Sequence, residues 1–150
     1  EAIVNGVLVA GGTVDAPIGR HKTKRTSMAV VPDGRESVTH YRLIEKFKDF
    51  THLRLKLESG RTHQIRVHMS HIRHPLVGDP LYGGRTRLPK GASQDFIDTL
   101  RGFSRQALHA VQLGLFHPTT GEWMTWQAPL PDDFMSLRDT LRKESPLLDE

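Results

Sequence analysis

The segment from Gly60 to Met69 carries the side chains of this sequence that are best suited to chemistry. Thr62 is a suitable N-cap, and a helix that starts after it offers free backbone N–H groups and a positive dipole end to a phosphate or carboxylate. Arg61 and Arg66 add fixed positive charge. Because Arg66 follows Ile65, which belongs to an apolar stripe, its guanidinium can reach into a cleft and hold a carboxylate in a bidentate grip. The residues alone favour the alternative, a surface arginine that extends to solvent.

A strand and a short helix must position this segment. Apolar and polar residues alternate from Thr51 to Glu58, which predicts a half-buried strand whose other face, beginning at His52, is wet. His63 to Ile72 has helical apolar spacing and is stopped by Pro75. The other predicted elements are strands at Ile3–Ala10 (with a hairpin turn at Asn5-Gly6), Met28–Val31, Val38–Phe47, Leu108–Phe116 and Trp123–Ala128, a loop at Gly78–Gly91, and helices at Phe96–Phe103 and from Pro131 onward. Together they predict a single α+β domain with a mainly antiparallel sheet and a few short helices.

Composition narrows the class of protein. The 150 residues include no cysteine, which excludes disulfides and thiolate metal sites, and no apolar run approaches the roughly 20 residues needed to span a bilayer. With no secretory signal at the start, we expect a cytoplasmic protein without membrane contact. The net charge is +4, although the last 20 residues are acidic. The basic remainder favours a polyanionic partner, with an ordinary basic surface as the alternative.

Four histidines between His63 and His74 are a possible metal site. His68 and His71 are three residues apart, which one helical face allows, and a histidine-metal hydrolase is therefore one hypothesis. No cysteine accompanies them, and the nearest acid downstream is Asp79. We therefore predict no metal. A serine hydrolase is not supported either, because the sequence has no Gly-x-Ser-x-Gly motif.

Ordered motifs along the chain carry a family resemblance. They are Gly12-Thr13-Val14-Asp15-Ala16-Pro17-Ile18, Gly60-Arg61-Thr62-His63-Gln64-Ile65-Arg66-Val67-His68, His74-Pro75-Leu76-Val77-Gly78-Asp79-Pro80-Leu81-Tyr82-Gly83, Arg105-Gln106-Ala107-Leu108-His109-Ala110 and His117-Pro118. In this order they closely resemble the C-terminal part of the catalytic domain of pseudouridine synthases of the RluA/RluD family. The segment from Arg20 to Arg25 and the run Lys90-Gly91-Ala92-Ser93 are similar to the branch that modifies large-subunit ribosomal RNA.

The resemblance implies a specific reaction. Family members isomerise uridine to pseudouridine in RNA, here large-subunit (23S) ribosomal RNA, without a metal or an organic cofactor. An aspartate attacks the uridine or assists cleavage of its glycosidic bond, and the uracil then rejoins the ribose through carbon 5. The target base must leave its stack to be reached.

The same resemblance assigns roles and exposes a gap. Arg66 matches the arginine that pairs with the catalytic aspartate, and Ile65 matches the residue that lines the uracil pocket. The family's aspartate lies in an Arg-Leu-Asp motif that does not occur here, and neither Asp79 nor Asp139 has that context. A family tyrosine just before the position of Glu1 is also absent. We therefore expect the C-terminal portion of a catalytic domain, inactive alone and lacking its N-terminal half.

If upstream strands are missing, open strand edges or an exposed apolar patch should remain. Trp123 and Trp126 lie on one predicted strand and should face opposite sides, so at least one is expected in the core.

The predicted RNA-binding residues fall into three groups. They are Arg20, Lys22, Lys24 and Arg25; Arg61, Thr62, His63 and Gln64; and Arg85, Arg87 and Lys90. Basic groups of this kind contact phosphates and supply affinity without sequence choice. Few aromatic residues accompany them, which disfavours a base-stacking platform for single strands. A non-catalytic RNA-binding module is therefore the alternative function.

Overall fold

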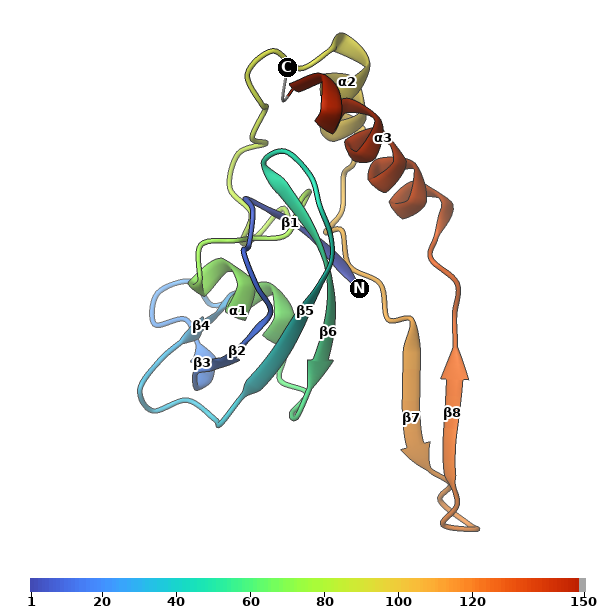
Figure 1. Cartoon of the computed structure of the whole chain (residues 1–150). Helices are drawn as coiled ribbons and strands as arrows, with labels where there is room; N and C mark the ends of the chain where they lie inside the picture. The colour runs from blue at the N-terminus through green and yellow to red at the C-terminus, as the bar shows by residue number, and fades with distance from the viewer. Residues whose placement is uncertain (149–150) are drawn as a thin grey trace.

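The computed structural model describes residues 1–148, which form three antiparallel sheets and three helices (Figure 1). The strands are β1 (Ala2–Asn5), β2 (Gly12–Asp15), β3 (Ile18–Arg20), β4 (Met28–Val30), β5 (Val38–Lys46), β6 (Phe50–Leu57), β7 (Gln112–Phe116) and β8 (Trp123–Gln127), and the helices are α1 (Gln64–His71), α2 (Gln94–Gly102) and α3 (Asp132–Leu148). This confirms the predicted α+β class. In this described part, no helix is both long and apolar enough to cross a membrane.

The main sheet has the strand order β1-β6-β5-β2 and separates two apolar clusters. Alternate residues of β1 point to opposite faces, so Ile3 joins the cluster under α2 and α3, whereas Ala2 and Val4 pack with Met69 of α1. All four residues of β1 are buried. Burial on both faces explains why this strand is apolar without alternation.

The predicted hairpin at Asn5-Gly6 is wrong. The strand ends at Asn5 and pairs with β6, as in the register Val4 to Thr51. Gly6 has a φ of 85° and donates its N–H to the carbonyl of Asp49 at 2.7 Å. This bond holds the residues after Gly6 beside the turn between β5 and β6, so they cannot form the second strand of a hairpin with β1.

The predicted wet face of β6 is wrong at its first residues. His52 is only 2% exposed, donates Nε2–H to the carboxylate of Glu1 at 2.7 Å, and lies 5.5 Å from the ring of Phe134. Helix α3 covers this end of the strand, which alternation within β6 could not reveal. Farther along, Arg54 and Lys56 are exposed as predicted.

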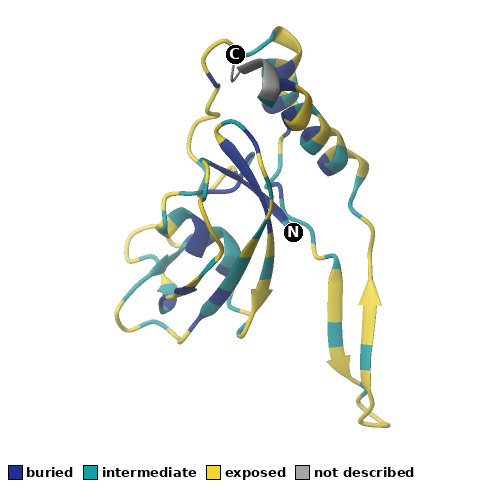
Figure 2. Ribbon diagram, viewed as in Figure 1, coloured by how far each residue is buried: buried dark blue, intermediate teal, exposed yellow. Residues whose placement is uncertain are grey.

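The strands β7 and β8 form an arm that projects from the body (Figures 1 and 2). The structure confirms the predicted hairpin. The prediction that at least one of its tryptophans lies in the core is wrong, since Trp123 is 58% and Trp126 is 46% exposed. Cross-strand pairs share a face, so Trp126 lies with Leu113 and Trp123 lies with Phe116 on the other side, the last two rings 4.9 Å apart. Apolar side chains are therefore exposed on both faces of the arm.

Candidate active site

The turn before α1 is held by a buried amide. Gln64 is 2% exposed; its carbonyl oxygen accepts from the Ser59 hydroxyl at 2.8 Å and the Arg61 N–H at 3.1 Å. Its NH₂ group donates to the Val38 carbonyl and the Thr39 hydroxyl, both at 3.0 Å. All of these bonds lie within the protein, two to the turn before α1 and two to the start of β5, whereas the RNA contact of Gln64 stays a prediction.

The start of α1 also differs from the prediction. The N-cap is His63, in the left-handed region with a φ of 56°, and it makes no side-chain cap bond. Thr62 is exposed and caps nothing, so the predicted cap is wrong. The bonds of Gln64 to the preceding turn replace the cap and shift the helix start by one residue.

The strongest interaction at the site joins Arg66 of α1 to Asp79. The Arg66 Nε and Nη2 groups donate to the two carboxylate oxygens of Asp79 at 2.9 and 2.8 Å. The Asp79 side chain is fully buried, and that of Arg66 is 11% exposed. The same carboxylate accepts the N–H groups of Leu81 and Tyr82 at 2.9 and 3.0 Å. This arrangement fixes the guanidinium plane in one orientation.

The ion pair lowers the pKa of Asp79 and raises the pKa of Arg66, and both shifts favour the charged forms. Burial alone would raise the pKa of Asp79, but the hydrogen bonds from Arg66, Tyr82 and Leu81 hold it below its ordinary range. The hydrogen bond to Asp79 raises the pKa of Arg66. Both groups are therefore ionised at neutral pH.

Tyr82 connects this pair to the small β3–β4 sheet. Its ring lies 5.1 Å from the Arg66 guanidinium carbon, and its hydroxyl accepts the Met28 N–H at 2.8 Å. The same hydroxyl is hydrogen-bonded to Nδ1 of His63 at 2.8 Å. Burial, followed by the charge of Arg66, lowers the pKa of His63, so its ring is neutral at neutral pH.

Asp79 is a partner of Arg66 that the sequence prediction did not include. The sequence predicts a carboxylate partner for Arg66 from outside the chain, and that stays a prediction; within the chain, Asp79 is a bidentate partner. One signal could have identified Asp79: it is the only acid between Glu58 and Asp95. Among the described residues, nothing accepts a hydrogen bond from the Arg66 Nη1 group, which remains available to a second carboxylate.

The remaining predicted residues lie in separate places. Ile65 is partly buried against the apolar cluster beneath α1. Three exposed bases, Lys22, Lys24 and Arg25, lie in the loop between β3 and β4, whose turn is closed by His21 Nδ1 accepting the Lys24 N–H at 3.1 Å. Arg85, Arg87 and Lys90 are exposed on a long loop between α1 and α2.

The clustered histidines have different protein partners. His68 is buried, donates Nε2–H to the Ala16 carbonyl at 2.8 Å and accepts from the Thr39 hydroxyl at 2.7 Å. His74 Nδ1 donates to the Asn5 carbonyl at 2.9 Å. Within residues 1–148 no three histidine or acidic side chains are grouped as metal ligands.

Comparisons with known proteins agree with this fold. Residues 2–71 match the family model for RNA pseudouridylate synthase. The solved structures of human RNA pseudouridylate synthase domain-containing proteins 4 and 1 superpose with a TM-score of 0.68 each at 26% identity, covering 94% and 99% of this chain and 60% and 63% of theirs. In sequence and in fold, the chain is therefore similar to pseudouridine synthases.

Its sequence is similar over nearly its whole length to ribosomal large subunit pseudouridine synthase D. The Haemophilus influenzae protein of that name is 61% identical, and the Escherichia coli K12 protein is 62% identical, each over 144 residues, or 96% of this chain. The chain spans 44% of the length of each of these relatives.

Proposed function

We propose that this chain is the C-terminal portion of a catalytic domain that isomerises uridine to pseudouridine in large-subunit ribosomal RNA. One observation carries the proposal: Arg66 is held rigidly by Asp79 while its Nη1 group remains unpaired among the described residues. A pre-oriented guanidinium with one free donor edge suits the binding of a second carboxylate. In the family resemblance, that second carboxylate is the catalytic aspartate.

Each residue then has a defined role. Arg66 orients the catalytic carboxylate and keeps it ionised, because a nearby cation favours the charged form. Ile65 supplies an apolar wall for the uracil. The isomerisation breaks the bond from the ribose to nitrogen 1 of uracil and forms one to carbon 5; carbon 5 loses its proton to water, and nitrogen 1 takes one up. Asp79 and Tyr82 act on the reaction only through Arg66, and they are positioning residues.

We infer that the upstream portion of the enzyme supplies the nucleophile and covers the β7–β8 arm. The sequence has no Arg-Leu-Asp motif, and the relatives are more than twice as long as the aligned region. The arm exposes Leu113, Phe116, Trp123 and Trp126, and an isolated two-stranded hairpin is marginally stable in water. Elements of the same domain packed on each side of the arm would bury both faces.

The test is complementation. RNA carrying tritium at uridine carbon 5 is incubated with the chain alone, with an upstream segment that contains Arg-Leu-Asp, and with both. We expect tritium release only from the mixture. Release by the chain alone would show that the nucleophile is not missing.

Association of the two pieces has its own readout. Both tryptophans of the chain lie on the arm, so docking should shift their fluorescence emission to the blue. Docking without tritium release would contradict the enzyme proposal and favour a non-catalytic RNA-binding module. An upstream segment in which the Arg-Leu-Asp aspartate is replaced by asparagine is the control, and it should dock without releasing tritium.

We also predict salt-sensitive RNA binding through the β3–β4 loop. Lys22 and Lys24 are exposed and have no carboxylate partner among the described residues. The double variant Lys22→Ala/Lys24→Ala should reduce the slope of log affinity against log salt by roughly one or two. The slope is measured by fluorescence anisotropy with an RNA stem–loop. The control variant Arg101→Ala/Lys143→Ala removes two charges from α2 and α3 and should leave the slope unchanged. If both double variants lowered the slope equally, the β3–β4 loop would contribute only through the net charge of the protein and not through direct phosphate contacts.

A further inference from the structure

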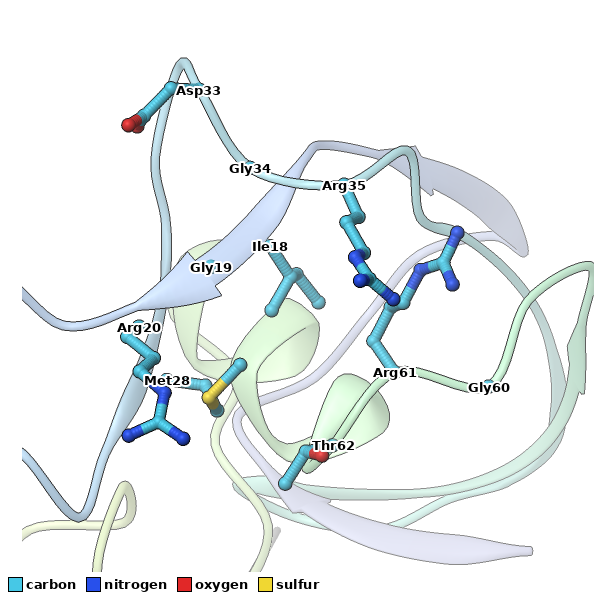
Figure 3. Close-up of a pocket in the computed structure, with 10 residues that line it drawn as sticks. All are labelled: Ile18, Gly19, Arg20, Met28, Asp33, Gly34, Arg35, Gly60, Arg61 and Thr62. Atoms are coloured by element: carbon cyan, nitrogen blue, oxygen red, sulfur yellow. The ribbon is translucent and has the colours of Figure 1, made fainter.

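A cavity of about 400 Å³ lies between the β3–β4 sheet and the turn that leads into α1 (Figure 3). Its lining residues are Ile18, Gly19, Arg20, Met28, Asp33, Gly34, Arg35, Gly60, Arg61 and Thr62. Arg20, Arg61 and Thr62 were predicted to bind RNA, whereas Arg35 was not. The cavity brings together residues from four separate parts of the sequence.

Three arginines give the cavity a positive rim. The side chains of Arg35 and Arg61 extend toward each other, whereas Asp33, the only acid in the lining, points away at the tip of its turn (Figure 3). Arg61 Nε donates to the Glu36 carbonyl at 3.1 Å, which positions its guanidinium, and neither terminal nitrogen has a partner among residues 1–148. Within the described chain, the side chains of Arg20 and Arg35 donate to no acceptor. Converging guanidiniums without an intervening carboxylate favour an anion between them.

The floor of the cavity is apolar, and two backbone segments approach each other closely there. Ile18 is 2% exposed, and Met28 lies beside it. Gly34 packs directly on the backbone of Ile18, so a Cβ at this position would lie 2.6 Å from the Ile18 carbonyl carbon. Only glycine permits that approach, and Arg35 is thereby carried over the cavity. Gly60, by contrast, faces open space, which leaves the mouth accessible.

The cavity adjoins the Arg66 site without being part of it. Met28, which lines the cavity, donates its N–H to the Tyr82 hydroxyl, and that hydroxyl is bonded to His63. Thr62 lies at the cavity and is followed directly by His63. The two sites are therefore connected through the hydrogen bonds that join Met28, Tyr82 and His63.

We propose that this cavity is a nucleotide subsite for the RNA, outside the uridine pocket. Arg35 and Arg61 bind one backbone phosphate, and the ribose or base of that nucleotide packs on Ile18 and Met28. The subsite rests on the proposed function, because its occupant is part of the RNA substrate. The exposed bases Lys22, Lys24 and Arg25 on the same β3–β4 unit continue the positive surface along the RNA backbone.

The experiment measures RNA binding by the 150-residue chain. Affinity for a fluorescein-labelled RNA stem–loop with uridines in its loop is compared among the parent chain, Arg35→Ala/Arg61→Ala and the charge-matched control Arg101→Ala/Lys143→Ala. We expect the cavity variant to bind about tenfold more weakly, with a salt slope reduced by about one, since each phosphate that is no longer bound lowers the slope by roughly one. The control should bind within about twofold of the parent chain. Circular dichroism verifies that each variant is folded.

A second readout tests the floor. The chain has four methionines, and the ¹³C-methyl resonance of Met28, assigned with Met28→Leu, should move when RNA is added, whereas that of Met135 on α3 should not. No binding by the parent chain would overturn the proposed function and this subsite with it. Parent binding with equal losses in the cavity and control variants, or a stationary Met28 resonance at saturating RNA, would overturn the subsite alone.

Discussion

Replacing Arg66 by alanine is expected to lower pseudouridine formation by roughly 10²–10³-fold in the complemented enzyme, while RNA affinity changes by less than about threefold. In the proposed mechanism, the guanidinium edge left free by Asp79 binds the reacting carboxylate, and the proposed phosphate contacts are on Arg35, Arg61 and the β3–β4 loop. Single-turnover rates at saturating enzyme and anisotropy titrations separate the two quantities.

The alanine variant also leaves Asp79 buried without its cation, so a control for folding is required. Arg66→Lys keeps the charge and one hydrogen bond to Asp79, but a lysine cannot present a bidentate fork together with a second donor edge. We expect this variant to fold and still to lose most of its turnover. Full activity of Arg66→Lys, or equal losses of turnover and affinity in Arg66→Ala, would contradict the carboxylate-orienting role.

Replacing Asp79 by alanine is expected to lower the free energy of unfolding of this chain by about 3–5 kcal/mol. The substitution strands a largely buried guanidinium and removes the acceptor of the Leu81 and Tyr82 N–H groups. Urea unfolding followed by circular dichroism measures the loss. Asp139→Ala is the matched control, because this carboxylate is 60% exposed and its surface pair with Arg138 should contribute at most about 1 kcal/mol.

The contribution of Asp79 should depend on pH in a defined direction. Its pKa in the folded protein lies below the ordinary value of 3.8, so its stabilisation is present above that value and is lost as the pH falls through the folded pKa. The stability difference between the parent chain and Asp79→Asn should therefore be constant near neutral pH and shrink in acid below about pH 4. A difference that persists unchanged in acid would mean that the charge of Asp79 contributes nothing.

Local sequence patterns predicted most helices and strands, but they did not predict which of these elements pair or pack with one another. The alternation from Thr51 to Glu58 and the helical spacing of Phe134, Leu137 and Leu141 lie within single segments, and the structure confirms both the strand and the helix. The hairpin at Asn5-Gly6 failed, because the true partner of β1 lies almost 50 residues away in β6. The burial of His52 depends on α3, which is even more distant in the chain.

The same division applies to the site. Arg66 was found from its motif, since the motif lies in one stretch of the sequence. Gln64 is predicted to bind RNA together with its neighbours Arg61, Thr62 and His63, yet packing turns its amide inward. Arg35 was missed, because it stands apart from the basic clusters and reaches Arg61 only when the β3–β4 unit packs beside α1.

By itself, the sequence predicted the resemblance to pseudouridine synthases, the α+β class and Arg66 as a candidate site residue, because each depends on residue types in local order. Only the tertiary structure decided that Asp79 holds Arg66, that Gln64 faces inward, and that Arg35 and Arg61 share one cavity. The physical reason is the same in each case. A buried polar group takes whichever partner the folded chain brings within hydrogen-bonding distance, and chain distance places no limit on that choice.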